Sequence, residues 1–425
     1  MLPLTSMNEV LEPCEGYEPF AKVKDESRWH HGAPRPRIRM RGVLFVESVC
    51  RSDESLCGEE ESLPLIGGVV VGLRDSSLPT LRVAQNDTHD WRKMFNGILP
   101  PLPTPFKEDG ALDLEALRSN VEQLNATGLA GYVALGTNSE AVHVTPEEAS
   151  QVFATVRQAS APGKIVIAGT GQLSTAATLD VTQRAADAGC DAALIVTPFY
   201  YKNSMTAEVL KKHYFTIADQ SPIPVMIYNV PANTGLNVAS SIVAEIAQHP
   251  NVVGIKDSAG DVNQLAETVR LTRRHEDKEP RRQGGKHPER SAAESKDATL
   301  ISASLRSASS ASEFMVFSGN YGAMLPSLSF GVVGGILAVS NIAPNECVRI
   351  HELFQQGKIA EAGELHLRLL PVARAVTAQF GVPGLKAAMD MLGYHGGYPR
   401  LPLLPLGENQ CAELEKVLRE AELLK

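Results

Sequence analysis

A lysine at the end of an apolar run is the residue of this chain whose position points most directly to chemistry. Lys256 follows two valines and an isoleucine in Asn251-Val-Val-Gly-Ile-Lys-Asp-Ser258, a pattern typical of a short buried strand. Apolar surroundings disfavour the charged ammonium form and make the free amine available. A free amine beside a carbonyl substrate forms a Schiff base. The alternative is a structural ion pair with a carboxylate such as Asp257.

Two further polar sites lie at the ends of other apolar runs. Tyr228 closes one of them, and a tyrosine hydroxyl near a Schiff-base lysine can move protons while the carbinolamine forms and loses water. The turn Gly136-Thr-Asn-Ser-Glu140 exposes hydroxyl and backbone N–H groups, which suits a carboxylate. We expect Glu140 to be a buried partner that fixes this turn. The alternatives are a rim tyrosine with a satisfied hydroxyl and an ordinary polar turn.

Eight apolar runs alternate with eight amphipathic helical patterns from residue 96 onward. Several helical patterns begin with capping chemistry, such as Thr145-Pro-Glu-Glu148, and Asp113 and Thr206 also suit N-cap positions. Strands that are apolar throughout indicate a parallel sheet covered by helices. Eight such units predict an α/β fold, a (β/α)8 TIM barrel with additional C-terminal helices. The strands are expected at 97–104, 130–136, 164–170, 191–197, 224–229, 251–257, 314–319 and 334–339.

A barrel of this kind carries its reactive groups at the carboxyl ends of its strands. Lys256 and Tyr228 then end the adjacent strands six and five, which favours the nucleophile over the ion pair. The residues expected at the strand ends are Thr104, Thr137, Asn138, Thr197, Tyr228, Lys256, Gly319 and Ile336.

The chain divides into regions of different composition. Residues 1–94 lack sustained periodicity, and we predict a poorly ordered N-terminal extension. Residues 95–425 form the predicted barrel domain with its C-terminal helices. Residues 275–313 are rich in Arg, Lys, Glu, Ser and Ala, and we predict a disordered insertion between helix six and strand seven. That end of the barrel is opposite the reactive end.

Composition excludes several classes of partner and cofactor. The net charge of -9 over 425 residues argues against nucleic acid and anionic membranes. No apolar stretch reaches the length of about 20 residues that spans a membrane. The six cysteines form no CxxC pair and no cluster with zinc spacing, and no nucleotide-binding motif occurs. We therefore expect no metal and no cofactor. No clear targeting segment is present, so the sequence leaves the compartment unknown.

Five segments together resemble a known family. The chain from about residue 96 to 424 resembles the dihydrodipicolinate synthase / N-acetylneuraminate lyase superfamily of class I aldolases. Neither the N-terminal extension nor the 275–313 insertion is covered by the resemblance. The matching segments are Leu102-Pro-Thr-Pro-Phe106, Gly136-Thr-Asn-Ser-Glu140, Val196-Thr-Pro-Phe-Tyr-Tyr201, Tyr228-Asn-Val-Pro-Ala-Asn-Thr-Gly235 and Gly254-Ile-Lys-Asp-Ser258.

The resemblance implies roles for the individual residues. It implies Lys256 as the Schiff-base residue and Tyr228 as the proton shuttle, assisted by Thr137. It implies that Thr137 and Asn138 hold the carboxylate of a small 2-oxo acid. Tyr200 resembles the family tyrosine that reaches a neighbouring subunit's site, which implies a homotetramer or homodimer. Ser258, Gly319 and Ile336 match positions that contact the substrate.

Three departures from the synthases bear on the substrate. Synthases usually carry an arginine at the position of Asn233 and a second threonine at the position of Asn138. At the position of Ser139 the family usually has a glycine. Asn138, the run Val230-Pro-Ala-Asn-Thr-Gly235 and the segment 381–394 resemble eukaryotic 4-hydroxy-2-oxoglutarate aldolases, which makes a mitochondrial location an expectation of the resemblance, whereas Ser139 bears on the shape of the turn 136–140. The expected reaction is then retro-aldol cleavage of 4-hydroxy-2-oxoglutarate to pyruvate and glyoxylate through an imine on Lys256. The alternatives are a 2-keto-3-deoxy sugar-acid aldolase, a dihydrodipicolinate synthase, or a non-catalytic barrel that binds a 2-oxo acid.

Overall fold

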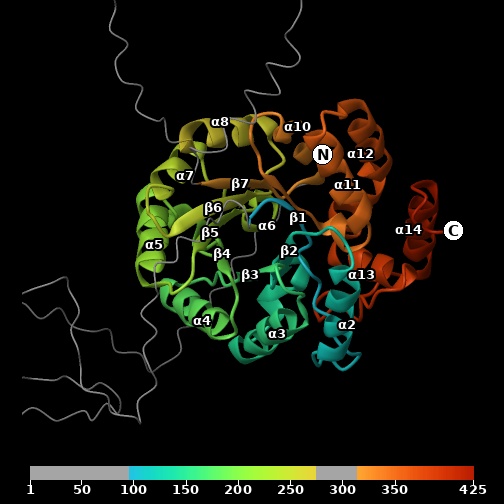
Figure 1. The fold of residues 1–425 in the computed structure, drawn as a ribbon. Coiled ribbons are helices and arrows are strands. Elements are labelled where there is room, and N and C mark those ends of the chain that lie inside the picture. Colours follow the sequence, from blue (N-terminus) through green and yellow to red (C-terminus); the bar gives the residue numbers. More distant parts are fainter. Residues whose placement is uncertain (1–94, 274–313) are drawn as a thin grey trace, which may run out of the picture. The chain divides into compact units, whose positions relative to one another are not determined.

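The computed structural model describes residues 95–273 and 314–425 (Figure 1). The predicted N-terminal extension (1–94) and the predicted insertion (275–313) lie outside the described residues. Within the described ranges, no helix is both long enough and apolar enough to cross a membrane.

The described residues contain one sheet of eight parallel strands, in the order β1-β8-β7-β6-β5-β4-β3-β2. Backbone hydrogen bonds bring its two edge strands together: Ala130 N–H donates to the Ile98 carbonyl and Val133 N–H to the Pro100 carbonyl, both at 2.9 Å. The sheet therefore forms a nearly closed barrel, and the predicted fold is confirmed. The strands are β1 Gly97–Leu99, β2 Gly131–Ala134, β3 Ile165–Gly169, β4 Ala192–Val196, β5 Val225–Asn229, β6 Val252–Asp257, β7 Met315–Ser318 and β8 Gly334–Ile336.

Helices surround the sheet, as Figure 1 shows. The predicted caps are present: the Thr145 hydroxyl accepts from Glu148 N–H and the Glu148 carboxylate accepts from Thr145 N–H, a reciprocal capping box. Asp113 and Thr206 also cap the helices that were predicted to begin after them. The helices between strands are α2 Leu114–Asn125, α3 Pro146–Ala159, α4 Thr175–Asp187, α5 Ala207–Gln220, α6 Pro231–Thr234, α7 Ser240–Ile246, α8 Val262–Thr272 and α10 Tyr321–Leu328, and α11 Pro344–Gln355 follows β8.

Apolar side chains fill both faces of the sheet. One cluster lines the barrel interior, and two larger clusters lie between the strands and the helices. Burial on both faces is the reason that the strands read as continuous apolar runs. The interior cluster includes Leu99, Val133, Ile167, Leu194, Met226, Tyr228, Phe317 and Ile336.

The C-terminal helices cover one side of the barrel beside α11 and α2 (Figure 1). They are α12 Ile359–Arg374, a π-helical turn at Ala375–Gln379, α13 Gly381–Met391 and α14 Glu408–Glu420. After α13 the chain returns to the connection between β1 and α2, where Tyr398 N–H donates to the Phe106 carbonyl at 2.9 Å. This return brings C-terminal residues next to the turn that follows β2.

Candidate active site

Lys256 and Tyr228 lie side by side at the carboxyl ends of β6 and β5. The two residues are register partners in the sheet. The Lys256 side chain is almost fully buried, with 3% of the residue exposed, and its Nζ lies 4.1 Å from the centroid of the Tyr228 ring. A primary amine over an aromatic face, in an apolar interior, is well placed to attack a carbonyl carbon that enters from the barrel mouth.

The ion pair between Lys256 and Asp257 that the sequence left open is not found. Successive side chains of a strand point to opposite faces, so Asp257 faces away from the barrel interior. Its carboxylate accepts hydrogen bonds from Ala259 N–H (2.8 Å), the Gln264 side chain (2.9 Å) and the Asn229 side chain (3.2 Å). Burial raises the pKa of Asp257, and these hydrogen bonds oppose that effect. Among the described residues, no ion pair involves Lys256.

Thr137 connects this pair to the barrel rim. It begins a short 3-10 turn, η1 Thr137–Ser139, after β2, and its side chain is half-buried. The Thr137 Oγ1 lies 3.0 Å from the Tyr228 hydroxyl oxygen, a hydrogen-bonding distance. The hydroxyls of Thr137 and Tyr228 therefore form a continuous path from the neighbourhood of Lys256 toward the rim, which is suited to proton transfer.

The turn that contains Thr137, residues 136–140, is called the carboxylate loop below. Leu135 and Glu140 flank η1 with φ angles of 57° and 55°, in the left-handed region. Ser139, which stands where the family usually has glycine, uses its hydroxyl to close the loop: Oγ accepts from Gly136 N–H at 3.1 Å and donates to the Leu102 carbonyl. The serine therefore ties the loop to the chain after β1. Asn138 is half-buried in the same loop.

Gly319 permits the close approach of β7 to the lysine. A Cβ added at Gly319 would lie 1.9 Å from the Ser258 Oγ and 3.1 Å from the Lys256 Cε. Only glycine leaves room for both side chains here. Ile336 ends β8 and is buried in the interior cluster with Tyr228. Six of the predicted site residues therefore lie around Lys256 or on the loop beside Tyr228.

Tyr200 is the predicted site residue that the structure does not bring to this group. It lies after β4, 71% of it is exposed, and its ring meets the Tyr201 ring edge-on at 5.1 Å. No contact of Tyr200 with Lys256 or Tyr228 is recorded among the described residues. Its predicted role in a neighbouring subunit stays a prediction.

Sequence reasoning missed the contacts that hold the carboxylate loop from outside. The Glu140 carboxylate forms a buried ion pair with Lys386 of α13 at 2.6 Å, and it accepts from Arg400 N–H at 2.8 Å. Burial lowers the pKa of Lys386, and Glu140 opposes this effect. Two signals were available: Glu140, which the sequence analysis expected to be a buried partner that fixes the turn, and a lysine within the apolar pattern of residues 381–391. Neither signal identified the other residue.

No cluster of three or more potential metal ligands occurs in residues 95–273 and 314–425. In this part of the chain the site therefore consists of a lysine, two hydroxyls and backbone N–H groups. Such a set can form an imine with a 2-oxo acid and move protons to and from it.

Comparison with known proteins places this site in a family. The model of the dihydrodipicolinate synthetase family matches residues 94–276 and 296–421. The 4-hydroxy-tetrahydrodipicolinate synthase of Methanothrix thermoacetophila is 35% identical over 325 residues, which cover 76% of this chain and 96% of the relative. Other curated relatives with 30–36% identity carry the same name.

Solved structures agree with these matches. A structure described as the first monomeric variant of dihydrodipicolinate synthase has a TM-score of 0.66 and 31% identity, covering 79% of this chain and all of that one. YagE of Escherichia coli K12, a prophage protein of the dihydrodipicolinic acid synthase family in complex with pyruvate, has a TM-score of 0.65 and 25% identity, covering 77% of this chain and 99% of that one.

The predicted 4-hydroxy-2-oxoglutarate aldolase activity is wrong by this comparison, because relatives that match over nearly their whole length are named as synthases. The prediction relied on Asn138, Asn233, the run 230–235 and the segment 381–394, a small part of the length over which the relatives match. The expectation of a lysine Schiff base with pyruvate, without metal or other cofactor, agrees with the chemistry of the family. The named relatives are archaeal and bacterial and do not support a mitochondrial location.

Proposed function

We propose that this chain, which belongs to the dihydrodipicolinate synthetase family, is a 4-hydroxy-tetrahydrodipicolinate synthase that condenses pyruvate with aspartate semialdehyde. The observation that carries the imine chemistry is the alignment of three groups: the Lys256 amine over the Tyr228 ring at 4.1 Å, and the Tyr228 hydroxyl 3.0 Å from Thr137. The names of the relatives support the choice of the second substrate.

The first half-reaction attaches pyruvate to the lysine. The Lys256 amine adds to the C2 carbonyl, and the carbinolamine loses one water to give a protonated imine. Tyr228 passes a proton to the departing oxygen and takes one from the nitrogen, with Thr137 as the next member of the path. In this proposal the pyruvate carboxylate lies on the carboxylate loop, where the Thr137 hydroxyl can donate to it. The N–H groups of Gly136, Ser139 and Glu140 close the loop itself.

The second half-reaction forms the carbon–carbon bond. Loss of a C3 proton converts the imine to an enamine, and its C3 attacks the aldehyde carbon of the semialdehyde. The aldehyde oxygen takes up a proton from Tyr228 and becomes the 4-hydroxyl group. The substrate's own amine then attacks C2 and displaces the Lys256 amine, which closes a six-membered ring. One water is released overall, in the first half-reaction.

The carboxylate of the semialdehyde is negatively charged and needs a positive partner. Synthases usually supply an arginine, but this chain has Asn233 at that position, so another residue must supply the charge. Asn233 is exposed on α6. Lys202 places a positive charge close to this segment. Its Nζ lies near Gly235, two residues beyond Asn233: a Cβ added at Gly235 would be 2.8 Å from it. No ion pair of Lys202 is recorded in the part of the chain that the structure describes. We assign this charge to the second carboxylate.

Borohydride trapping tests the first half-reaction. Reduction of the protein with pyruvate should give a covalent adduct on the peptide that contains Lys256, and Lys256→Ala should give none while keeping its melting temperature. An aldehyde panel tests the second half-reaction: aspartate semialdehyde should be consumed fastest with pyruvate, ahead of glyoxylate and sugar aldehydes. Adduct formation with faster use of glyoxylate would refute the synthase proposal and leave the imine chemistry standing.

Lys202→Met tests the assignment of the second carboxylate. We expect the KM for aspartate semialdehyde to rise about two- to fivefold, which corresponds to the loss of one exposed charge pair of up to about 1 kcal/mol, with pyruvate trapping unchanged. Lys416→Met is the matched control, because Lys416 is an exposed lysine of α14 that pairs with Glu420. An equal change in the two variants would mean that Lys202 acts only through net charge.

The predicted homotetramer or homodimer belongs to the same proposal. Tyr200 would complete the site of a neighbouring subunit, in agreement with its exposed position. Mixing inactive Lys256→Ala chains with inactive Tyr200→Phe chains should restore part of the turnover if subunits share sites. A monomer in sedimentation analysis that is fully active would contradict the shared site.

A further inference from the structure

A buried ion pair joins the carboxylate loop to the C-terminal helices. Glu140 ends the loop, and Lys386 lies in α13, far along the chain. The Lys386 Nζ lies 2.6 Å from the Glu140 Oε1, and each side chain is only 1% exposed. Removing two charges from water is costly and is offset only by good geometry and additional hydrogen bonds.

The remaining contacts of this pair also come from the C-terminal segment or from the loop's own surroundings. Lys386 donates to the Tyr398 carbonyl at 2.7 Å, and its Nζ lies 4.6 Å from the centroid of the Phe106 ring. The second Glu140 oxygen accepts from Arg400 N–H at 2.8 Å and lies 3.2 Å from the His143 Nδ1. The ion pair is thus held both by residues of the C-terminal segment and by residues around the carboxylate loop.

Glu140 transmits this constraint to the site through the backbone. Its φ of 55° is left-handed, a conformation that is uncommon outside glycine and persists where the surroundings impose it. Its N–H donates to the Thr137 carbonyl at 3.1 Å, which closes the turn. The Thr137 hydroxyl in turn lies 3.0 Å from the Tyr228 hydroxyl. Three contacts therefore connect Lys386 to Tyr228.

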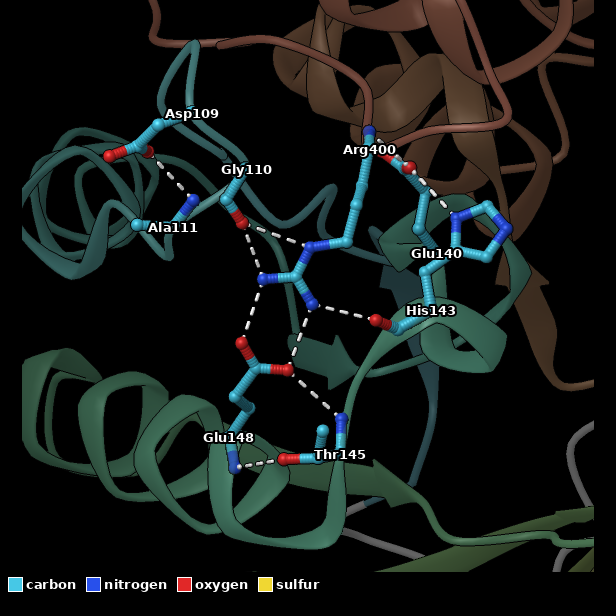
Figure 2. A network of polar contacts seen from close by, with 8 residues as sticks. All are labelled: Asp109, Gly110, Ala111, Glu140, His143, Thr145, Glu148 and Arg400. Carbon is cyan, nitrogen blue, oxygen red and sulfur yellow. Dashed lines mark hydrogen bonds and ion pairs between the residues drawn. The ribbon is translucent and has the colours of Figure 1, made fainter.

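Arg400 forms a second clamp, shown in Figure 2. Its guanidinium binds both oxygens of Glu148 at the start of α3, at 2.7 and 2.8 Å. It also donates to the carbonyls of Gly110 (2.6 and 3.0 Å) and His143 (2.6 Å). Its Cζ lies 4.2 Å from the centroid of the Phe106 ring. This planar, bidentate contact fixes the orientation of the Arg400 guanidinium as well as its distance from the Glu148 carboxylate.

We propose that Lys386 and Arg400 are positioning residues for substrate binding: α13 and the segment that follows it set the conformation of the carboxylate loop, and so the affinity for pyruvate. This inference rests on the proposed function for the role of Thr137. The competing explanation is that both residues only anchor the C-terminal helices. The two explanations differ in what a mild substitution changes, because anchoring alone would alter stability without altering pyruvate affinity.

Arg400→Ala is the main test, because its side chain is partly exposed (18%) and the buried ion pair stays in place. The pyruvate concentration that gives half-maximal borohydride trapping should rise about tenfold, while the maximal adduct stays the same. Arg400→Lys should recover only part of the affinity, because lysine cannot bind both Glu148 oxygens. The matched control is Arg419→Ala, which removes an arginine that binds Glu415 within α14 at 2.7 and 3.0 Å.

The buried pair gives a second test. Lys386→Met leaves Glu140 charged and unpaired and should destabilise the protein strongly. The double variant Glu140→Gln/Lys386→Met removes both charges and should regain most of the melting temperature but retain the weakened pyruvate affinity. Full recovery of both quantities would overturn the positioning role.

Hydrogen exchange of the loop amides separates this inference from the proposed function. Exchange at 137–140 should be faster in Arg400→Ala than in Arg419→Ala, whether or not pyruvate binds. An unchanged loop together with unchanged trapping would overturn the inference. Absence of any pyruvate adduct in the unsubstituted chain would instead overturn the proposed function, and the exchange rates would still decide whether Arg400 holds the loop.

Discussion

Replacement of Tyr228 by phenylalanine removes one oxygen from the centre of the site and leaves the ring in place. The Lys256 Nζ lies over that ring at 4.1 Å, so the contact that orients the amine is kept. The lost group is the hydroxyl that lies 3.0 Å from the Thr137 Oγ1. Tyr228→Phe therefore separates proton transfer from the placement of the nucleophile.

The expected loss of turnover follows from the size of general acid–base catalysis. Proton transfer by a positioned side chain contributes about 10²–10⁴ in rate, which corresponds to about 3–5 kcal/mol of barrier. One hydrogen bond contributes only about 1 kcal/mol to folding, and the half-buried Thr137 can bond to water instead. Turnover should therefore fall at least a hundredfold with a melting temperature close to that of the unsubstituted protein.

The assay measures turnover with both substrates and the rate of pyruvate trapping at Lys256. Both should fall in Tyr228→Phe, because carbinolamine dehydration also needs the proton. Tyr132→Phe is the matched control: Tyr132 is a fully buried tyrosine of β2 whose hydroxyl donates to the Asn125 side chain at 2.8 Å, away from Lys256. Turnover of Tyr228→Phe within about threefold of the unsubstituted protein would refute the proton path.

Two other predictions concern crowding at the lysine and acid stability. Gly319→Ala should lower turnover because its Cβ would lie 1.9 Å from the Ser258 Oγ and 3.1 Å from the Lys256 Cε, whereas Gly363→Ala, with nothing within 4 Å, should leave turnover unchanged. Equal turnover in the two variants would contradict the crowding. Burial lowers the pKa of His213 to about 4. The unfolded chain binds this proton near pH 6.5, so stability should fall by up to about 3 kcal/mol as pH drops from about 6.5 to about 4. Chemical denaturation of His213→Gln should show a smaller fall over that range; an identical fall would contradict this cause.

Features with a local physical cause were predictable from the sequence. The capping box at Thr145 involves residues three apart, and the buried strands are continuous apolar runs. The proximity of Lys256 and Tyr228 followed from one further step, because parallel strands that are consecutive in a barrel end at the same rim. The predicted strand ends extend beyond the observed ones, most at β1, which ends at Leu99 rather than at residue 104. Proline-rich sequence after Leu99 cannot donate regular ladder hydrogen bonds.

Contacts between residues that lie far apart in the sequence were not predictable. Arg400 and Glu148 are 252 residues apart, and no periodicity relates them. A lysine in an apolar helical pattern, such as Lys386, implies a partner but does not identify Glu140. The proposed partner of the second carboxylate was not predictable for a related reason. Asn233 is an exposed residue of α6, and its identity shows only that the arginine of the synthases is absent. The sequence does not show that Lys202 lies close to Gly235, two residues further on.

The contrast between buried and exposed groups predicts that the two proposed half-reactions can be separated by substitution. Lys256 and Tyr228 lie in the packed barrel interior, where a substitution disturbs several neighbours at once. Asn233 on α6 and Lys202 on the short 3-10 turn Lys202–Ser204 are exposed, so a change of charge there disturbs few neighbours besides the ligand. Imine formation should therefore tolerate substitutions at the rim, whereas the choice of aldehyde should respond to them. If Lys202→Met weakened pyruvate trapping as much as it weakened use of the semialdehyde, this separation would not hold.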